Sequence, residues 1–140
     1  MIREYPDIRQ DAENNCGDAA VSGVFKFLGE WPAPPMATDH DGLHPSTIEG
    51  QFRLAGLRVQ SGEMTLADLK HHASQMRPVL CPIDVYGGHW VTVLGVTAKR
   101  IRFHCPMRGF LWDTPEGFLE VWKDSTRSGH KFTNWGIAVS

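Results

Sequence analysis

The spacing of apolar residues predicts a first helix in the segment 19–29. Its apolar face recurs at helical intervals and consists of four residues: Val21, Val24, Phe25 and Leu28. Asn14 and Asn15 are residues suited to an N-cap, and Gly29 is suited to a helix end. The pattern therefore predicts a helix that begins near Cys16, after a polar, extended lead-in.

Two further helices are expected in the first half of the chain. In the segment 46–56, Ser46 is a candidate N-cap. In the segment 66–76, the preceding Thr65 and the following Asp68 have the spacing of a capping box. These helices are separated from the first by a loop rich in proline and from each other by a short strand near Leu57 and Val59.

After Arg77 the chain becomes rich in β-branched and aromatic residues, which favour strands. Four segments have this character: 77–85, 89–97, 99–105 and 134–140. Turns at Gly87–Gly88 and Ala98–Lys99 separate the first three, and Pro115 opens a short amphipathic piece. Helices followed by antiparallel strands predict an α+β fold, with N-terminal helices packed on a C-terminal antiparallel sheet. We expect a single domain spanning residues 1–140.

Composition supports a folded protein and excludes several function classes. Hydrophobic residues make up 41% of the 140 residues and charged residues 21%, so the chain can bury a core. The formal net charge is −2 and no basic block occurs, which argues against a nucleic-acid partner. No apolar run is long enough to span a membrane. We expect the tryptophans to lie mostly in the core, Trp90, Trp112 and Trp122 among them.

The chain has three cysteines, Cys16, Cys81 and Cys105, and no CxxC pair. An odd number argues against a disulfide framework, and Cys81 in an apolar strand is expected in the core. The N-terminal stretch is polar and acidic, unlike a signal peptide. A cytoplasmic location is therefore the default expectation, although release by lysis or a non-classical secretion route would leave no mark in the sequence.

Cys16 has the surroundings of a nucleophile. At a helix start, unpaired backbone N–H groups and the helix dipole favour the thiolate, which is the reactive form. Gly17 leaves space beside the sulfur, and Gln10, six positions earlier, is placed to supply a second donor to an oxyanion. His89 opens a strand after a glycine pair, so its backbone is fixed while its ring stays accessible, as a general base requires.

These residues resemble the double-glycine leader peptidases that process bacteriocin precursors, which are papain-like cysteine peptidases. The resemblance rests on Gln10, the pair Cys16-Gly17, the segment GGHWVTVLGV around His89, and the downstream segments IRFHCPMRG and TPEGFLEVW. It covers nearly the whole chain, in the family's order. It implies a papain-like fold, Cys16 as nucleophile, His89 as base and Gln10 as oxyanion donor.

The sequence departs from the family at one position. The family's Asp-Pro, whose carboxylate orients the histidine, corresponds here to Cys105-Pro106. Cys105, Asp113 and Asn134 are the candidates for the third member, and a dyad without a third member is a further option. The departure also opens an alternative function, a catalytically impaired binding module that uses the fold to hold a peptide.

The expected substrate is a peptide or protein. A leader peptide, a peptidoglycan peptide and a partner protein all remain open, and the same dyad can also perform acyl transfer. A third hypothesis is a metalloprotein with Cys and His ligands. Separately, Asp39, His40, Asp41 and His44 form a polar cluster of residue types that can bind a metal. We favour a solvated loop there, because Gly42 and several prolines suit a turn. No cofactor or metal is expected.

Overall fold

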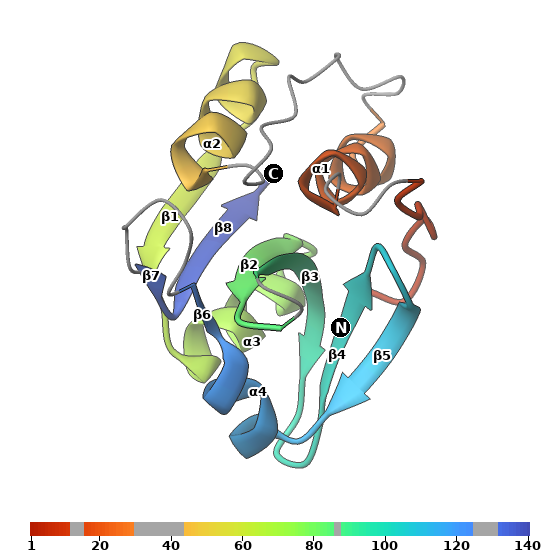
Figure 1. The fold of residues 1–140 in the computed structure, drawn as a ribbon. Helices are drawn as coiled ribbons and strands as arrows, with labels where there is room; N and C mark the ends of the chain where they lie inside the picture. Colours follow the sequence, from red (N-terminus) through yellow and green to blue (C-terminus); the bar gives the residue numbers. More distant parts are fainter. Residues whose placement is uncertain (12–15, 30–43, 86–87, 125–131) are drawn as a thin grey trace.

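The structure is a computed structural model, and it describes residues 1–11, 16–29, 44–85, 88–124 and 132–140. Figure 1 shows the arrangement of the elements along the chain. The helices of the described residues are α1 (Cys16–Phe27), α2 (Pro45–Leu54), α3 (Leu66–Ser74) and α4 (Pro115–Val121). The strands are β1 (Val59–Glu63), β2 (Val79–Ile83), β3 (His89–Val96), β4 (Ile101–Cys105), β5 (Gly109–Asp113), β6 (Lys123–Asp124), β7 (Phe132–Thr133) and β8 (Trp135–Val139).

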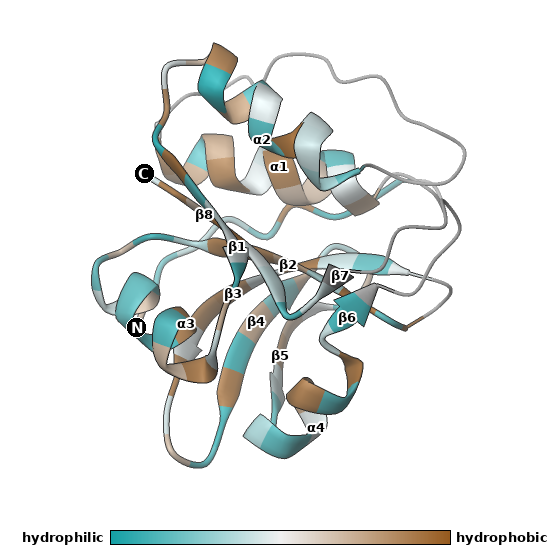
Figure 2. Cartoon of the chain, turned by 90° about the vertical axis from the view of Figure 1, so that its left-hand side faces the viewer, coloured by the Kyte–Doolittle hydropathy of each residue, from teal (hydrophilic) through white to brown (hydrophobic). Residues whose placement is uncertain are grey.

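A sheet of six strands forms the centre of the molecule, in the order β1-β8-β2-β3-β4-β5. Every neighbouring pair in it is antiparallel. Helices α1 and α2 lie over one face and α3 and α4 over the other (Figure 2). The α+β fold expected from the sequence, with helices packed on an antiparallel sheet, is confirmed.

Each face of the sheet carries its own hydrophobic core. The core beneath α1 and α2 includes Phe25, Phe52 and Trp90, and the core on the α3 and α4 side includes Cys81 and Phe118. Strand β3 serves both cores, because its alternate side chains point to opposite faces. This explains why its sequence reads as an almost continuous apolar run.

The lead-in segment of residues 1–11 lies along β3 and β4. The backbone N–H of Ile2 donates to the carbonyl oxygen of Leu94 at 2.8 Å, and Nη1 of Arg102 donates to the carbonyl oxygen of Ile2 at 2.7 Å. Near the end of the segment, the backbone N–H of Gln10 donates to the carbonyl oxygen of Pro106 at 2.9 Å. The segment is therefore attached to β3 and β4 near its start and to the turn after β4 near its end.

The expected helix starts are partly right. The capping box of α3 is confirmed, since Asp68 N donates to Thr65 Oγ1 at 3.2 Å and Thr65 N donates to Asp68 Oδ2 at 2.8 Å. The expectation that Ser46 caps α2 is wrong, because the helix already begins at Pro45. His44 is the N-cap, and Ser46 N donates to its Nδ1 atom at 3.1 Å. Pro45 suits the first helical position because its fixed φ fits the helix. An N–H at this position would have no partner inside the helix, so proline loses nothing by lacking one.

Two features of the second half differ from the expectation. Strand β5 was not expected, nor was the short pair β6–β7. Trp90 and Trp122 are buried as expected, but Trp112 is 49% exposed. Trp112 is exposed because β5 forms the edge of the sheet.

Candidate active site

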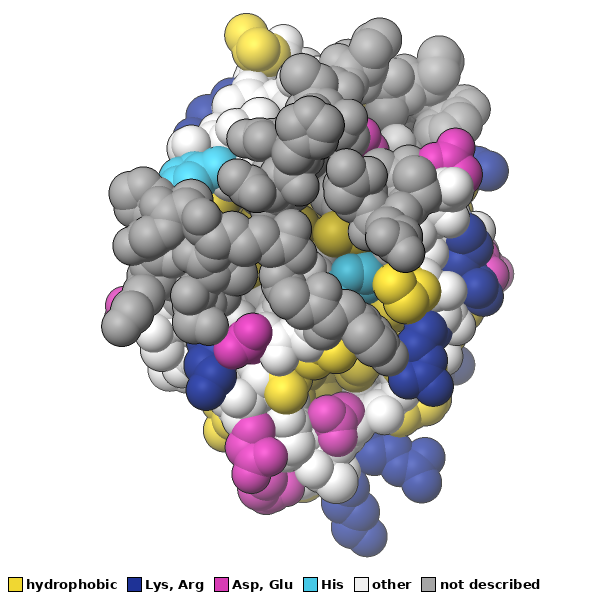
Figure 3. Space-filling view, in the orientation of Figure 1, with side chains coloured by type: hydrophobic (Ala, Val, Ile, Leu, Met, Phe, Trp, Pro, Cys, Tyr) yellow, Lys and Arg dark blue, Asp and Glu magenta, His cyan; other side chains and the backbone are white. Residues whose placement is uncertain are grey.

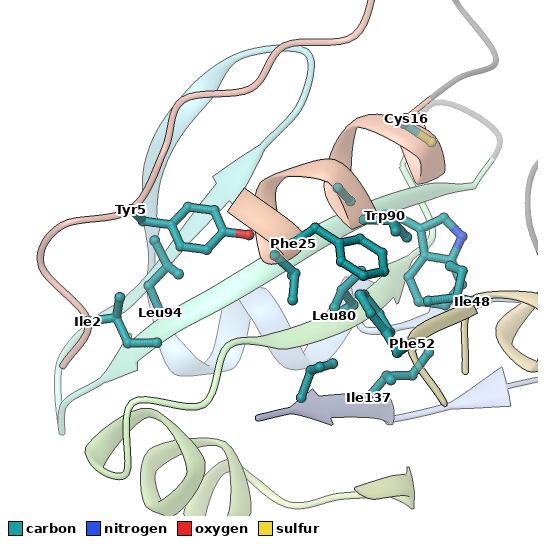
Figure 4. Close-up of a cluster of buried hydrophobic side chains, with 14 residues drawn as sticks. Ile2, Tyr5, Cys16, Phe25, Ile48, Phe52, Leu80, Trp90, Leu94 and Ile137 are labelled. Carbon is teal, nitrogen blue, oxygen red and sulfur yellow. The ribbon is translucent and has the colours of Figure 1, made fainter. Parts of the chain in front are cut away.

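Cys16 is the first residue of α1, and its side chain is only 6% exposed. The first backbone N–H groups of a helix have no partner inside the helix, so a thiolate at this position is favoured. Figure 4 shows Cys16 at the end of α1 that lies nearest to Trp90. The expected N-cap residues Asn14 and Asn15 lie outside the described residues.

His89 is the first residue of β3, directly before Trp90, and it is 5% exposed. Helix α1 packs on β3, so the strand that carries His89 lies against the helix that begins with Cys16. Burial lowers the pKa of His89, since a low-dielectric environment disfavours the imidazolium. The ring is therefore neutral at pH 7, the state in which it accepts a proton.

Cys105 lies behind the ring of His89. Its Sγ atom is 3.2 Å from Nε2 of His89, and its side chain is 3% exposed at the end of β4. The structure therefore brings together a histidine and the cysteine that occupies the position of the expected carboxylate. None of the cysteines Cys16, Cys81 and Cys105 forms a disulfide.

Gln10 lies beside the same hairpin. Its backbone N–H donates to Pro106, the residue that follows Cys105. The β4–β5 hairpin thus fixes the backbone of the candidate oxyanion donor and also carries the side chain that contacts His89. Gln10 and His89, which are far apart in the sequence, are therefore both held by the β4–β5 hairpin.

A polar network next to this hairpin was not foreseen from the sequence. His104 is 2% exposed, and its Nε2 atom lies 2.7 Å from Oδ1 of Asp7. The Arg9 Nε atom donates to the same Asp7 oxygen at 2.7 Å. The hydrogen bond from Arg9, followed by that from His104, lowers the pKa of Asp7. A Cβ atom on Gly109 would lie 2.3 Å from Nη2 of Arg9, so the arginine packs directly over this glycine.

This network anchors the residues just before Gln10. Asp7 lies three positions before Gln10 and is bound to His104 of β4. Arg9 lies one position before Gln10 and packs over Gly109, the first residue of β5. The sequence did hold one signal for it, since His104 interrupts an otherwise apolar end of a strand. A buried histidine requires a polar partner, although its identity could not be read from spacing.

The other candidates for the third member lie elsewhere. Asp113 is at the far end of β5, where it pairs with Ile101, and its Oδ1 accepts from Thr114 N at 2.7 Å. Asn134 lies between β7 and β8 with φ 52°, and its carbonyl oxygen accepts from Met64 N at 2.8 Å. Of the three candidates, Cys105 is the one that contacts the ring of His89 among the described residues.

The loop residues Asp39, His40 and Asp41 lie outside the described residues, while His44 caps α2. Within the described ranges, no group of three or more His, Cys, Asp or Glu side chains is placed to hold a metal ion. In the same ranges, no helix has the length and apolar character needed to cross a membrane.

We compared the sequence and the fold with those of known proteins. No protein-family model matches the sequence, and a search of curated proteins finds no match. Several solved structures are similar to this fold, and those described below are peptidase domains.

One is a double-glycine motif protease from an AMS/PCAT transporter, in complex with its leader peptide. It has a TM-score of 0.74 at 19% identity, over 97% of this chain and 91% of that one. Another is the peptidase domain of Streptococcus ComA, a bifunctional ABC transporter. It has a TM-score of 0.73 at 16% identity and covers 95% of this chain and 96% of that one. The peptidase domain of Streptococcus mutans ComA has a TM-score of 0.70 at 14% identity over 95% and 97%. The chain therefore has the fold of double-glycine peptidase domains.

Proposed function

We propose that the chain is a papain-like cysteine peptidase or amidase that hydrolyses a peptide or isopeptide bond. The observation that carries this proposal is that the two candidate catalytic residues begin two elements that pack against each other. Helix α1 begins with Cys16, and the strand on which it packs, β3, begins with His89. In a fold shared with peptidase domains, this arrangement supplies a nucleophile and a base where these two elements begin.

The reaction follows from these groups. His89 takes the proton of the Cys16 thiol, the resulting thiolate attacks the carbonyl carbon, and the carbonyl π electrons move to the oxygen. The N–H of Cys16 and the side-chain amide of Gln10 hold that oxyanion. As the C–N bond breaks, His89 gives its proton to the leaving amine, and an acyl-enzyme remains. His89 then takes a proton from water, whose oxygen attacks the thioester and releases Cys16.

Cys105 orients the ring in this scheme. A contact at Nε2 leaves Nδ1 as the nitrogen that exchanges the proton with Cys16 and the leaving group. A neutral thiol stabilises the imidazolium less than a carboxylate does. Removing the orienting group usually costs less than removing the nucleophile or the base. The chain therefore operates as a dyad with a weakly polar support.

The substrate is a peptide or protein. One structural neighbour holds a leader peptide, which supports a peptide as the substrate. A leader peptide, a peptidoglycan peptide and a partner protein all satisfy the chemistry described above.

A second candidate function is a catalytically impaired module that binds a peptide without cleaving it. The thiol of Cys105 in contact with His89, in place of a carboxylate, is the observation that favours it. The two candidates differ in the state of Cys16, because catalysis requires a reactive thiolate.

Thiol labelling and a cleavage screen distinguish them. A catalytic Cys16 should react with iodoacetamide at pH values well below the ~8.5 of an ordinary thiol, and faster than the buried Cys81. Mass spectrometry of the labelled protein reads out both sites. A peptide library should be cleaved by the parent protein and not by Cys16→Ala. If Cys16 labels no faster than Cys81 and the library stays intact, the binding module is the correct assignment.

A further inference from the structure

Strand β5 exposes two aromatic side chains at the edge of the sheet. Phe110 is 38% exposed and Trp112 is 49% exposed. They are two positions apart, so they lie on the same face of the strand. Edge strands are usually protected against pairing, and large exposed aromatics on such a strand are typical of an interaction site.

An arginine stacks on each of these rings. The guanidinium carbon of Arg102 lies 5.0 Å from the ring centroid of Phe110, and that of Arg100 lies 5.7 Å from the ring of Trp112. We call Phe110, Trp112, Arg100 and Arg102 the β5 aromatic–arginine surface. The two arginines, like the two rings, are two residues apart, a step of roughly 6.7 Å along a strand.

The positive charge of this surface is not balanced locally. Among the described residues, neither Arg100 nor Arg102 forms an ion pair, while Asp7 is bound by Arg9 and His104. Nη1 of Arg102 donates to the carbonyl oxygen of Ile2, which is uncharged. Figure 3 shows Lys and Arg gathered on the side of the molecule that carries β4 and β5, with Asp and Glu gathered near α4.

The surface lies next to the candidate active site. Gly109, the first residue of β5, pairs with Cys105, whose sulfur contacts His89. From Gly109 to Trp112 is three residues, a distance of roughly 10 Å along an extended strand. Phe110 contacts His104, which is bound to Asp7 three positions before Gln10, so the surface borders the segment that carries the candidate oxyanion donor.

We propose that the β5 aromatic–arginine surface binds an extended, acidic segment of the peptide substrate, with carboxylates at alternate positions seated on Arg102 and Arg100. An extended peptide presents same-side residues about every 6.7 Å, which matches the step between the arginines. A guanidinium held against a ring loses less freedom on binding. Arg100 can offer its N–H fork to a carboxylate, and Arg102, whose Nη1 donates to Ile2, can offer its other N–H groups. This inference rests on the proposed function, because it defines the substrate class of the same site.

Equilibrium binding to a Cys16→Ser protein tests the inference without turnover. The probe is a fluorescein-labelled peptide of serine and threonine with two glutamates two positions apart. Matched probes carry the glutamates at adjacent positions or replace both by glutamine. The protein variants are Arg100→Gln and Arg102→Gln, and the control is Arg53→Gln on the exposed surface of α2. Fluorescence anisotropy gives the dissociation constant at low salt, where charge pairing is least screened.

We expect Arg100→Gln and Arg102→Gln each to weaken binding about threefold, and the double variant roughly tenfold, with no change in Arg53→Gln. The glutamine probe should bind as weakly as the parent probe binds to the double variant. Arg102→Gln also removes a bond to Ile2, so Arg100→Gln carries the test if circular dichroism shows that Arg102→Gln unfolds.

Equal affinity of parent and Arg100→Gln, or of the glutamate and glutamine probes, overturns the inference. So does tighter binding of an oligodeoxythymidine, or self-association that disappears in the same variants, because the occupant would then be a nucleic acid or a second copy. The proposed function fails separately. Binding by the surface in a parent protein that cleaves no peptide leaves this inference standing and refutes peptidase activity.

Discussion

The Nε2 atom of His89 lies 3.2 Å from the Sγ atom of Cys105, and both side chains are buried. A thiol therefore stands where an orienting carboxylate would be expected behind the histidine. This contact leads directly to a gain-of-function experiment, because a carboxylate there should stabilise the imidazolium more strongly.

We predict that Cys105→Asp makes Cys16 more reactive. A carboxylate beside an imidazolium raises the histidine pKa by about one unit or more, which also favours the neighbouring thiolate. The pH midpoint of Cys16 alkylation by iodoacetamide should fall, and peptide turnover should rise roughly tenfold. Cys105→Ala is the matched control and should lower turnover. An unchanged alkylation profile in Cys105→Asp would show that position 105 does not act on the pair.

Gln10→Ala should reduce kcat about 100-fold with little change in KM, because an oxyanion donor acts mainly in the transition state. Steady-state kinetics on a cleaved library peptide measures this effect. Gln60→Ala, at an exposed position of β1, is the control and should behave as the parent protein does. If kcat stays within about twofold of the parent in Gln10→Ala, another group holds the oxyanion.

Gly109→Ala and Gly50→Ala should change stability in opposite directions. Gly109 has φ 88°, and a Cβ atom there would meet Arg9 at 2.3 Å, so alanine should cost about 2 kcal/mol. Gly50 lies inside α2, where a Cβ atom meets nothing within 4 Å, so alanine should stabilise by about 0.5–1 kcal/mol. Urea unfolding measures both. A neutral Gly109→Ala would contradict the left-handed backbone conformation of this residue, because the end of the Arg9 side chain can move aside whereas the backbone strain would remain.

The unfolding free energy should fall as the pH drops below about 6.5. Burial lowers the folded-state pKa of His89 and of His104 below the ordinary value of 6.5. As the pH falls below 6.5, both histidines are protonated in the unfolded chain before they are protonated in the folded chain. The contribution of the two neutral histidines to the unfolding free energy is therefore complete above pH 6.5 and is lost as the pH falls toward their folded-state pKa values. The slope in that window is about 1.4 kcal/mol per pH unit for each histidine.

Urea unfolding at several pH values between about 5 and 8 measures this slope. His104→Gln should flatten it, whatever its effect on stability at neutral pH. The lowered pKa of Asp7 acts in a separate window, because its stability is lost only as the pH falls below 3.8. An equal slope in the parent and in His104→Gln would contradict the prediction for His104.

Local signals in the sequence accounted for most of the fold. The Thr65–Asp68 capping box is a contact between residues three apart, so spacing alone was enough to predict it. The apolar run of β3 is equally local, since a strand covered on both faces needs apolar residues throughout. Resemblance to a known family supplied the positions of Cys16 and His89, and the structure places them at the starts of α1 and β3.

Contacts between distant segments were harder to predict. Strand β5 begins with a glycine and follows the short turn 106–108, and its residues Phe110, Leu111 and Trp112 show no alternation of apolar and polar positions that would reveal a strand. The pair Asp7–His104 joins residues 97 positions apart, and no periodicity links them. Cys105 behind His89 was a candidate because of its place in a motif. Asp113 was a candidate because it follows a few residues later, and Asn134 because Asn134-Trp135-Gly136 resembles the Asn-containing motif of papain.

The short turn between β4 and β5 has a consequence for how this protein can change over generations. The turn follows Cys105, carries the Pro106 carbonyl that holds Gln10, and exposes Met107 and Arg108. Substitutions at the two exposed positions leave the backbone path intact, so genetic drift can sample them freely. An inserted or deleted codon would displace the supports of His89 and Gln10 in a single event. Selection should therefore conserve the length of this turn more strictly than its composition.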